Sequence, residues 1–204
     1  MRLKHLLKLP GGKARPDLPV LGSRVPRPEE IVILPLPLLR ATEKIGRVAK
    51  DAQAKWAFGG DAGEIIKGVN LHTDHLEIIT TKAGTEEICK LLAEYVTTPP
   101  ADAEKRLARD ADVDAKMLPV YVKSHYAELT VDKVRVEVYG DLQYKVAEWE
   151  WGDPIDFIVE YVNVVGTNVP TVPLRLKSEL DLGLGWLDRV ELISDAVIRS
   201  QHRH

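Results

Sequence analysis

The chain has 204 residues, a mass of 22.8 kDa, 45% hydrophobic residues and 29% charged residues. These values are typical of a globular domain with a buried core, and they exclude a collagen-like, coiled-coil or wholly disordered protein. A net charge of −3 gives no global reason to expect sequence-independent binding of nucleic acid, and the single cysteine, Cys89, excludes an intramolecular disulfide.

The first 37 residues predict a proline-rich arm. Residues 10–37 hold seven of the thirteen prolines, and the run before them, Met1 to Leu9, is too short and too charged for a signal peptide or a membrane span. We therefore expect a cytoplasmic protein with no membrane partner. The few Met, Cys, Asn and Gln residues favour a thermophilic source, and a homodimer is the default if the arm covers a neighbouring subunit.

Helix and strand signals alternate after the arm. In chain order they predict a helix at 38–54, a strand at 56–58 that ends at Gly59 and Gly60, a helix at 62–67 stopped by Gly68, a strand at 75–79, and a helix from 84 towards Tyr95. Cys89 lies among the apolar positions of that last helix, which predicts a buried structural thiol.

The second half of the chain changes period. Residues 101–116 are strongly charged and could form a helix or an exposed excursion, whereas alternating valines predict three half-buried strands within 118–151. A further strand at 157–165 and a helical pair from Pro173 follow. We expect an α/β (α+β) fold, a mixed sheet with helices on one face, divided into the arm 1–37, a core at 38–165 and a C-terminal helical segment at 166–204.

Strand alternation gathers polar side chains on one face of the expected sheet. His75 and Glu77 point away from the apolar residues of their strand, and Arg135 and Glu137 point away from the valines that flank them. If the two strands are neighbours, His75, Glu77 and Glu137 share the open face. Taken singly, each acid is better explained as an exposed strand residue in a weak salt bridge, and the order of the elements is what favours a site.

The order of these elements resembles the nucleotidyltransferase superfamily. The resemblance is carried by the residues at 55–62 (KWAFGGDA), at 69–78 (VNLHTDHLEI) and at 136–138 (VEV), and it covers residues 38–140. In that superfamily a glycine pair ends the first strand, and a Thr-x-Asp-hydrophobic-Asp pattern supplies two metal-binding carboxylates. Within it, the chain is most similar to minimal, antitoxin-like or archaeal members.

The resemblance implies roles for seven residues. It implies a catalytic and metal-binding group formed by His75, Glu77 and Glu137, with Mg or Mn as the cofactor, and a nucleotide-binding group formed by Gly59, Gly60, Asp61 and Thr73. Arg135, on the polar face of its strand, is a further candidate for a contact with phosphate, and a charge-rich solvated face of the sheet is the alternative. The implied partners are a nucleoside triphosphate and a hydroxyl acceptor on a small molecule, RNA or protein.

The metal-binding motif departs from the family pattern at two positions. His75 stands where the first aspartate is expected, and Glu77 is one methylene longer than the second. Histidine offers a softer nitrogen that suits manganese, zinc or nickel better than magnesium. Either the metal has changed, or catalysis is lost and a nucleotide-binding or protein-interaction module of an antitoxin or regulatory complex remains. An unrelated structural α/β protein is the third alternative.

His72 and His75 suggest a separate transition-metal site by composition alone. Residues three apart on a strand point to opposite faces, which argues against that site.

Overall fold

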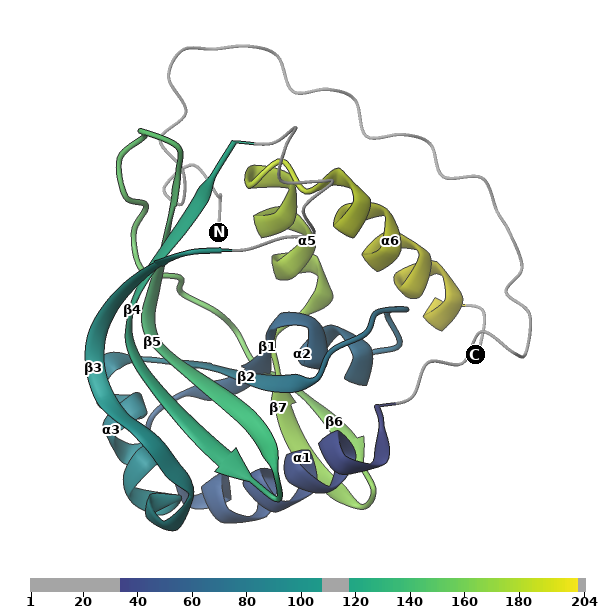
Figure 1. The fold of residues 1–204 in the computed structure, drawn as a ribbon. Helices are drawn as coiled ribbons and strands as arrows, with labels where there is room; N and C mark the ends of the chain where they lie inside the picture. Colours follow the sequence, from purple (N-terminus) through teal and green to yellow (C-terminus); the bar gives the residue numbers. More distant parts are fainter. Residues whose placement is uncertain (1–33, 108–117, 202–204) are drawn as a thin grey trace.

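A seven-stranded mixed sheet forms the centre of the molecule in the computed structural model, which describes residues 34–107 and 118–201 (Figure 1). Its strands lie in the order β3-β4-β5-β2-β1-β7-β6. Their bounds are β1 Trp56–Gly59, β2 His75–Thr80, β3 Val96–Arg106, β4 Val120–Val131, β5 Val134–Val146, β6 Glu160–Val164 and β7 Thr167–Thr171. β2 runs parallel to β5, and β1 runs parallel to β7, while the other neighbours are antiparallel.

Helices pack on both sides of this sheet at different places. Their bounds are α1 Leu36–Val48, α2 Gly60–Ile66, α3 Lys82–Leu91, α5 Leu174–Gly183 and α6 Leu187–Gln201, with single 3-10 turns at Ala49–Asp51 and Ala93–Tyr95. α1 and α3 lie together under one face, whereas α5 and α6 lie at the opposite side of the molecule (Figure 1). The α+β class with a mixed sheet and C-terminal helices, expected from the sequence, is confirmed.

The main core lies between α1, α3 and the apolar face of the sheet. Leu76 and Ile78 of β2 and Val136 and Val138 of β5 are fully buried there. Their alternate neighbours emerge on the other face, where Glu77 of β2 lies opposite Glu137 of β5 in the strand register. The alternation of side chains along each strand therefore produces the apolar face and the polar face that the sequence predicts.

Two helix starts are set by local chemistry. Pro37 occupies the first turn of α1, where a missing N–H costs no hydrogen bond, so this helix begins two residues before the expected Leu38. Thr81 caps α3 by accepting a hydrogen bond from the Gly84 N–H at 3.1 Å, so α3 begins at Lys82. Cys89 of α3 is buried as expected, and burial raises the pKa of its thiol to about 11.

The structure corrects the expectation for residues 96–106. They form the long edge strand β3, although neither strand nor pairing was expected around Pro99 and Pro100. An edge strand tolerates proline because one row of its N–H groups needs no partner in the sheet, and the β3–β4 register shifts between Thr98 and Ala101. The alternatives of a helix or an exposed excursion at 101–116 fail for 101–106, and residues 108–117 lie outside the described part.

Two strands, β4 and β5, occupy the region 118–151, where the sequence predicts three. Residues 134–146 form one continuous strand, β5, which pairs along its length with β4. The register shift between Lys123 and His125 absorbs the break in alternation that suggested separate strands.

The chain from residue 160 contributes both strands and helices. β6 begins at Glu160, and β7 inserts between β1 and β6, so the segment at 166–204 starts with a strand that the sequence did not indicate. The expected helical pair after Pro173 is confirmed as α5 and α6. The boundaries of the three predicted parts stay predictions, and residues 1–33 of the arm lie outside the described range.

Within 34–107 and 118–201, none of the helices combines the length and apolarity needed to cross a bilayer.

Candidate functional site

Three potential metal ligands converge where β2 and β5 run side by side. The His75 Nε2 atom lies 3.3 Å from Glu77 Oε1 and 3.7 Å from Glu137 Oε2. All three ligand atoms lie within 4.8 Å of one another. The parallel pairing of β2 with β5 places Glu77 opposite Glu137 and thereby assembles the cluster. The structure thus brings together the three residues that the sequence grouped.

Glu137 is the most heavily contacted member of this cluster. Its side chain is 7% exposed; Tyr139 donates to Oε2 at 2.5 Å, and Tyr126 donates to Oε1 at 3.1 Å. The Lys105 ammonium lies 3.3 Å and the Arg135 guanidinium 3.5 Å from Oε1. Burial opposes ionisation of Glu137, but the Tyr139 hydrogen bond and the Lys105 charge lower its pKa below the ordinary value.

His75 lies between carboxylates on both sides of its ring. Its Nδ1 atom is 2.8 Å from Oδ1 of Asp74, whose side chain is 92% exposed, while Nε2 faces Glu77. The hydrogen bond to Glu77 is the main reason that the pKa of His75 rises to about 9. The Thr73 hydroxyl donates to the His75 carbonyl at 3.1 Å, so Thr73 fixes the start of β2 and does not line the cavity beside the cluster.

The turn from β1 into α2 needs a glycine next to the cluster. Gly60 has a φ of +53°, and a Cβ added to it would lie 2.0 Å from Glu77 Oε2. The Gly60 backbone therefore lies so close to the Glu77 carboxylate that no side chain fits between them. Gly59, one residue earlier, faces Ile79, whose Cδ1 atom would lie 2.5 Å from such a Cβ.

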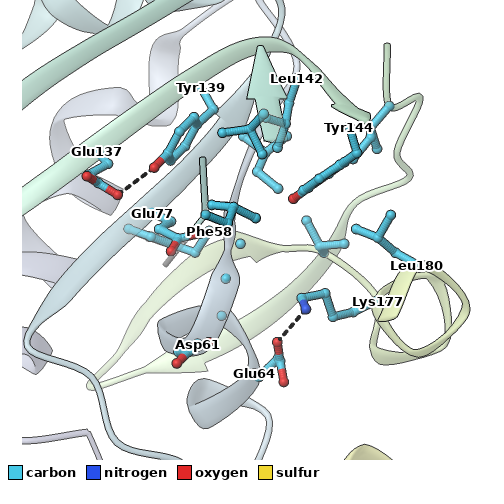
Figure 2. Close-up of a pocket in the computed structure, with 18 of the residues that line it drawn as sticks. Phe58, Asp61, Glu64, Glu77, Glu137, Tyr139, Leu142, Tyr144, Lys177 and Leu180 are labelled. Atoms are coloured by element: carbon cyan, nitrogen blue, oxygen red, sulfur yellow. Dashed lines mark hydrogen bonds and ion pairs between the residues drawn. The ribbon is translucent and has the colours of Figure 1, made fainter. Parts of the chain in front are cut away.

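A cavity of about 730 Å³ opens beside the cluster. Its walls include the cluster, the glycine turn, Arg135 and Lys105, together with an apolar part formed by residues such as Phe58, Leu142 and Tyr144. Figure 2 shows Glu77 and Glu137 on one side of this space and Lys177 of α5 on another, with the Tyr144 hydroxyl directed inwards. A charged rim beside an apolar wall suits a ligand with an anionic group and a flat organic part.

A second charged group forms the wall between α2, α5 and α6. Lys177 pairs with Glu64 at 3.2 Å and with Asp181 at 2.5 Å, and Arg189 pairs with Asp61 and, at 3.2 Å, with Glu64. Glu64 is 3% exposed and Asp181 is fully buried, and burial raises the pKa of both carboxyls. These ion pairs attach the C-terminal helices to the helix that follows the glycine turn.

The sequence did not indicate this second group. The spacing of Lys177 and Asp181, four residues apart on one helix, was the available signal. Glu64 and Arg189 are 125 residues apart, and sequence periodicity carries no information on such a pairing. Asp61, expected near phosphates, lies in the cavity wall but is paired with Arg189.

The His75, Glu77 and Glu137 donors fit a divalent cation. Adjacent ligands of a cation bound at about 2.1 Å lie about 3 Å apart, close to the 3.3 Å between His75 and Glu77. One imidazole nitrogen and two carboxylate oxygens form a borderline donor set that suits manganese better than magnesium. The roles that the resemblance implies for these residues, and for Gly59, Gly60, Asp61 and Thr73, stay predictions, as does the phosphate contact expected of Arg135.

Comparisons with known proteins find similarity at the level of structure. No protein-family model and no curated protein sequence matches the chain. A crystal structure from Thermotoga maritima, described as that of a provisionally assigned nucleotidyltransferase, superposes with a TM-score of 0.62 at 22% identity and covers 84% of this chain and 98% of that one.

A second structure shows weaker similarity. It is an antigenic nucleotidyltransferase-like protein from Paracoccidioides brasiliensis, with a TM-score of 0.44 at 10% identity, over 80% of this chain and 75% of that one. That similarity is too low to support an argument about this chain. The Thermotoga maritima structure shows that this chain shares its fold.

Proposed function

We propose that this chain binds a nucleoside triphosphate in the cavity beside β2 and β5 and transfers its nucleotidyl group to a hydroxyl acceptor. The observation that carries the proposal is the convergence of His75, Glu77 and Glu137 within 4.8 Å, on the wall of a cavity that also contains the glycine turn. The fold of the Thermotoga maritima structure supports the same function class. The acceptor belongs to a small molecule, an RNA or a protein.

A divalent cation is the proposed cofactor. His75, Glu77 and Glu137 would hold it, and it would neutralise charge on the triphosphate and favour ionisation of the attacking hydroxyl. The imidazole ligand leads us to propose manganese ahead of magnesium.

The polar residues around the cluster would position the triphosphate. Arg135 lies in the cavity wall with a side chain that is 47% exposed, which leaves its guanidinium accessible to a phosphate. At Gly60 the absence of a side chain would let phosphate oxygens approach the backbone. Gly59 shares this turn, while Thr73 and Asp61 would act by holding β2 and α2 in place.

The transfer exchanges one phosphorus–oxygen bond for another. The acceptor oxygen forms a bond to the α-phosphorus, the bond from that phosphorus to the bridging oxygen breaks, and pyrophosphate leaves with the bonding electrons. The hydroxyl proton passes to Glu77, whose side chain is 27% exposed and carries fewer hydrogen bonds than Glu137. Glu137, with its tyrosine and lysine contacts, stays a fixed anion.

Thermal unfolding with each of ATP, CTP, GTP and UTP, combined with magnesium, manganese or zinc, tests the binding step. A nucleotide at 100 times its dissociation constant stabilises the folded state by about 2.7 kcal/mol. That corresponds to a rise in Tm of about 5–10 °C for a chain of this size. We expect a metal-dependent rise in the wild type and its loss in Glu77→Ala.

The pattern of results separates the alternatives. Binding followed by release of pyrophosphate supports the transferase, whereas binding without release would support a nucleotide-responsive module. The absence of a shift with every nucleotide and metal would contradict the proposed function.

A further inference from the structure

Lys105 is a cation that the sequence did not place in the site. It stands on β3, directly beside the cluster, and its ammonium lies 3.3 Å from Glu137 Oε1. The ammonium donates to the Tyr139 hydroxyl at 2.8 Å and lies 4.9 Å and 5.0 Å from the ring centres of Tyr126 and Tyr139. One hydroxyl group and two aromatic faces thus hold this positive charge against the Glu137 carboxylate.

This charge competes with any metal that Glu137 would bind. Oε1 of Glu137 already faces Lys105, Arg135 and the Tyr126 hydroxyl, and Oε2 accepts from Tyr139. The His75 Nε2 atom lies 3.7 Å from Oε2, and the ligand atoms of all three residues lie within 4.8 Å of one another. A divalent cation placed there would be repelled by the nearby ammonium, so Lys105 weakens metal binding while no anion is present.

The same ammonium faces the space where phosphates would lie. An ammonium has three N–H donors, and Lys105 has hydrogen-bond acceptors for two of them, Tyr139 and Glu137, within the described residues. Its side chain is 42% exposed and lines the cavity. A phosphate oxygen can therefore accept the third N–H while the contacts to the tyrosines persist.

We propose that Lys105 is a nucleotide-dependent positioning residue: it neutralises Glu137 in the free protein and contacts the triphosphate in the complex. The inference rests on the proposed function and adds a residue and a charge-exchange step to it. Before nucleotide binds, Lys105 opposes the metal; after nucleotide binds, the triphosphate offsets the ammonium and both cations are retained. Removal of the charge therefore has opposite effects on the two ligands.

The test measures two affinities of the full chain by calorimetric titration, Mn²⁺ alone and a non-hydrolysable nucleoside triphosphate with Mn²⁺. In Lys105→Met we expect Mn²⁺ alone to bind about 3–10 times more tightly and the triphosphate about 5–20 times more weakly, which are changes typical of one charged contact. Lys105→Arg should restore the triphosphate affinity to within about threefold, because it keeps the charge.

A matched control and a folding control accompany these variants. Lys123→Met removes a lysine that is exposed on the adjacent strand β4, and it should change neither affinity. Thermal unfolding shows whether each variant is folded, and Lys105→Gln replaces Lys105→Met if the latter is not.

Opposite changes in the two affinities support the proposal, because a purely structural residue would lower both or neither. Unchanged Mn²⁺ affinity, or a shift of both affinities in one direction, overturns it. If the wild type binds Mn²⁺ and no triphosphate, the proposed function fails. Tighter Mn²⁺ binding in Lys105→Met would then support the competition between Lys105 and the metal, but the proposed contact between Lys105 and a phosphate would be overturned.

Discussion

Replacement of Gly60 by alanine should separate backbone strain from damage to the site. At a φ of +53° an L-residue costs about 1–2 kcal/mol relative to glycine. The new Cβ would lie 2.0 Å from Glu77 Oε2 and 2.2 Å from Cδ, so the carboxylate must rotate away. Because Glu77 then leaves His75, a further loss of about 1 kcal/mol follows. We expect a total destabilisation of about 2–3 kcal/mol.

Gly166→Ala is the matched control for this variant. Gly166 also has a positive φ, +81°, but a Cβ there meets nothing within 4 Å. Urea unfolding should show a loss of about 1–2 kcal/mol for Gly166→Ala. Calorimetry should show unchanged Mn²⁺ binding for this control and at least a tenfold loss for Gly60→Ala. Equal stability losses in the two variants, with Mn²⁺ affinity retained in Gly60→Ala, would refute the contact between the glycine turn and Glu77.

Three other perturbations have defined outcomes. His75→Asp should raise Mg²⁺ affinity at least tenfold in a calorimetric titration, because it restores a hard oxygen ligand; unchanged affinity would contradict the assigned ligand set. Lys177→Met should lower the free energy of unfolding by about 3–5 kcal/mol, because buried carboxylates lose their partner, whereas Arg175→Met, at a side chain 90% exposed on the same helix, should cost less than about 1 kcal/mol in urea. Burial opposes the charge on His125, but contacts with Glu86 and Asp102 raise its pKa above 6.5. Protonated His125 therefore stabilises the fold fully below that ordinary value, and this stabilisation is lost as the pH rises through the pKa of the folded state. The free energy of unfolding of the wild type should thus exceed that of His125→Gln by less as the pH rises, and a difference that grows with pH would contradict the prediction.

The side chains that the sequence located are those governed by strand alternation. His75 and Glu77 are two residues apart on one strand, and Glu137 is flanked by valines, so their common face follows from a period of two. Their actual contact depends on the parallel pairing of β2 with β5, which a period of two does not determine. The polar face could thus be predicted from the local sequence, whereas the contact between the three residues depends on the order of the strands in the sheet.

Lys105 and the second charged group were not predictable in this way. Lys105 lies 32 residues before Glu137, in a charged segment after two prolines that carries no strand period. Its place in the site follows from β3 joining the sheet edge beside β4. Lys177 reaches Glu64 only because α5 packs beside the cavity, and no local pattern encodes that distance of 113 residues, the difference between the two residue numbers.

The charges of the site predict that metal and triphosphate bind with positive coupling. If His75 is left out of the count, the two negative charges of Glu77 and Glu137 equal the two positive charges of Lys105 and Arg135. A divalent cation that binds alone therefore gives the site an excess of positive charge. A triphosphate removes that excess, and each ligand should then raise the affinity for the other by the same factor, about 5–150-fold. Mn²⁺ titrations with and without a saturating non-hydrolysable triphosphate, corrected for Mn²⁺ bound by free nucleotide, measure this factor. Equal Mn²⁺ affinities in the two titrations would mean that the protein's own cations do not face the phosphates.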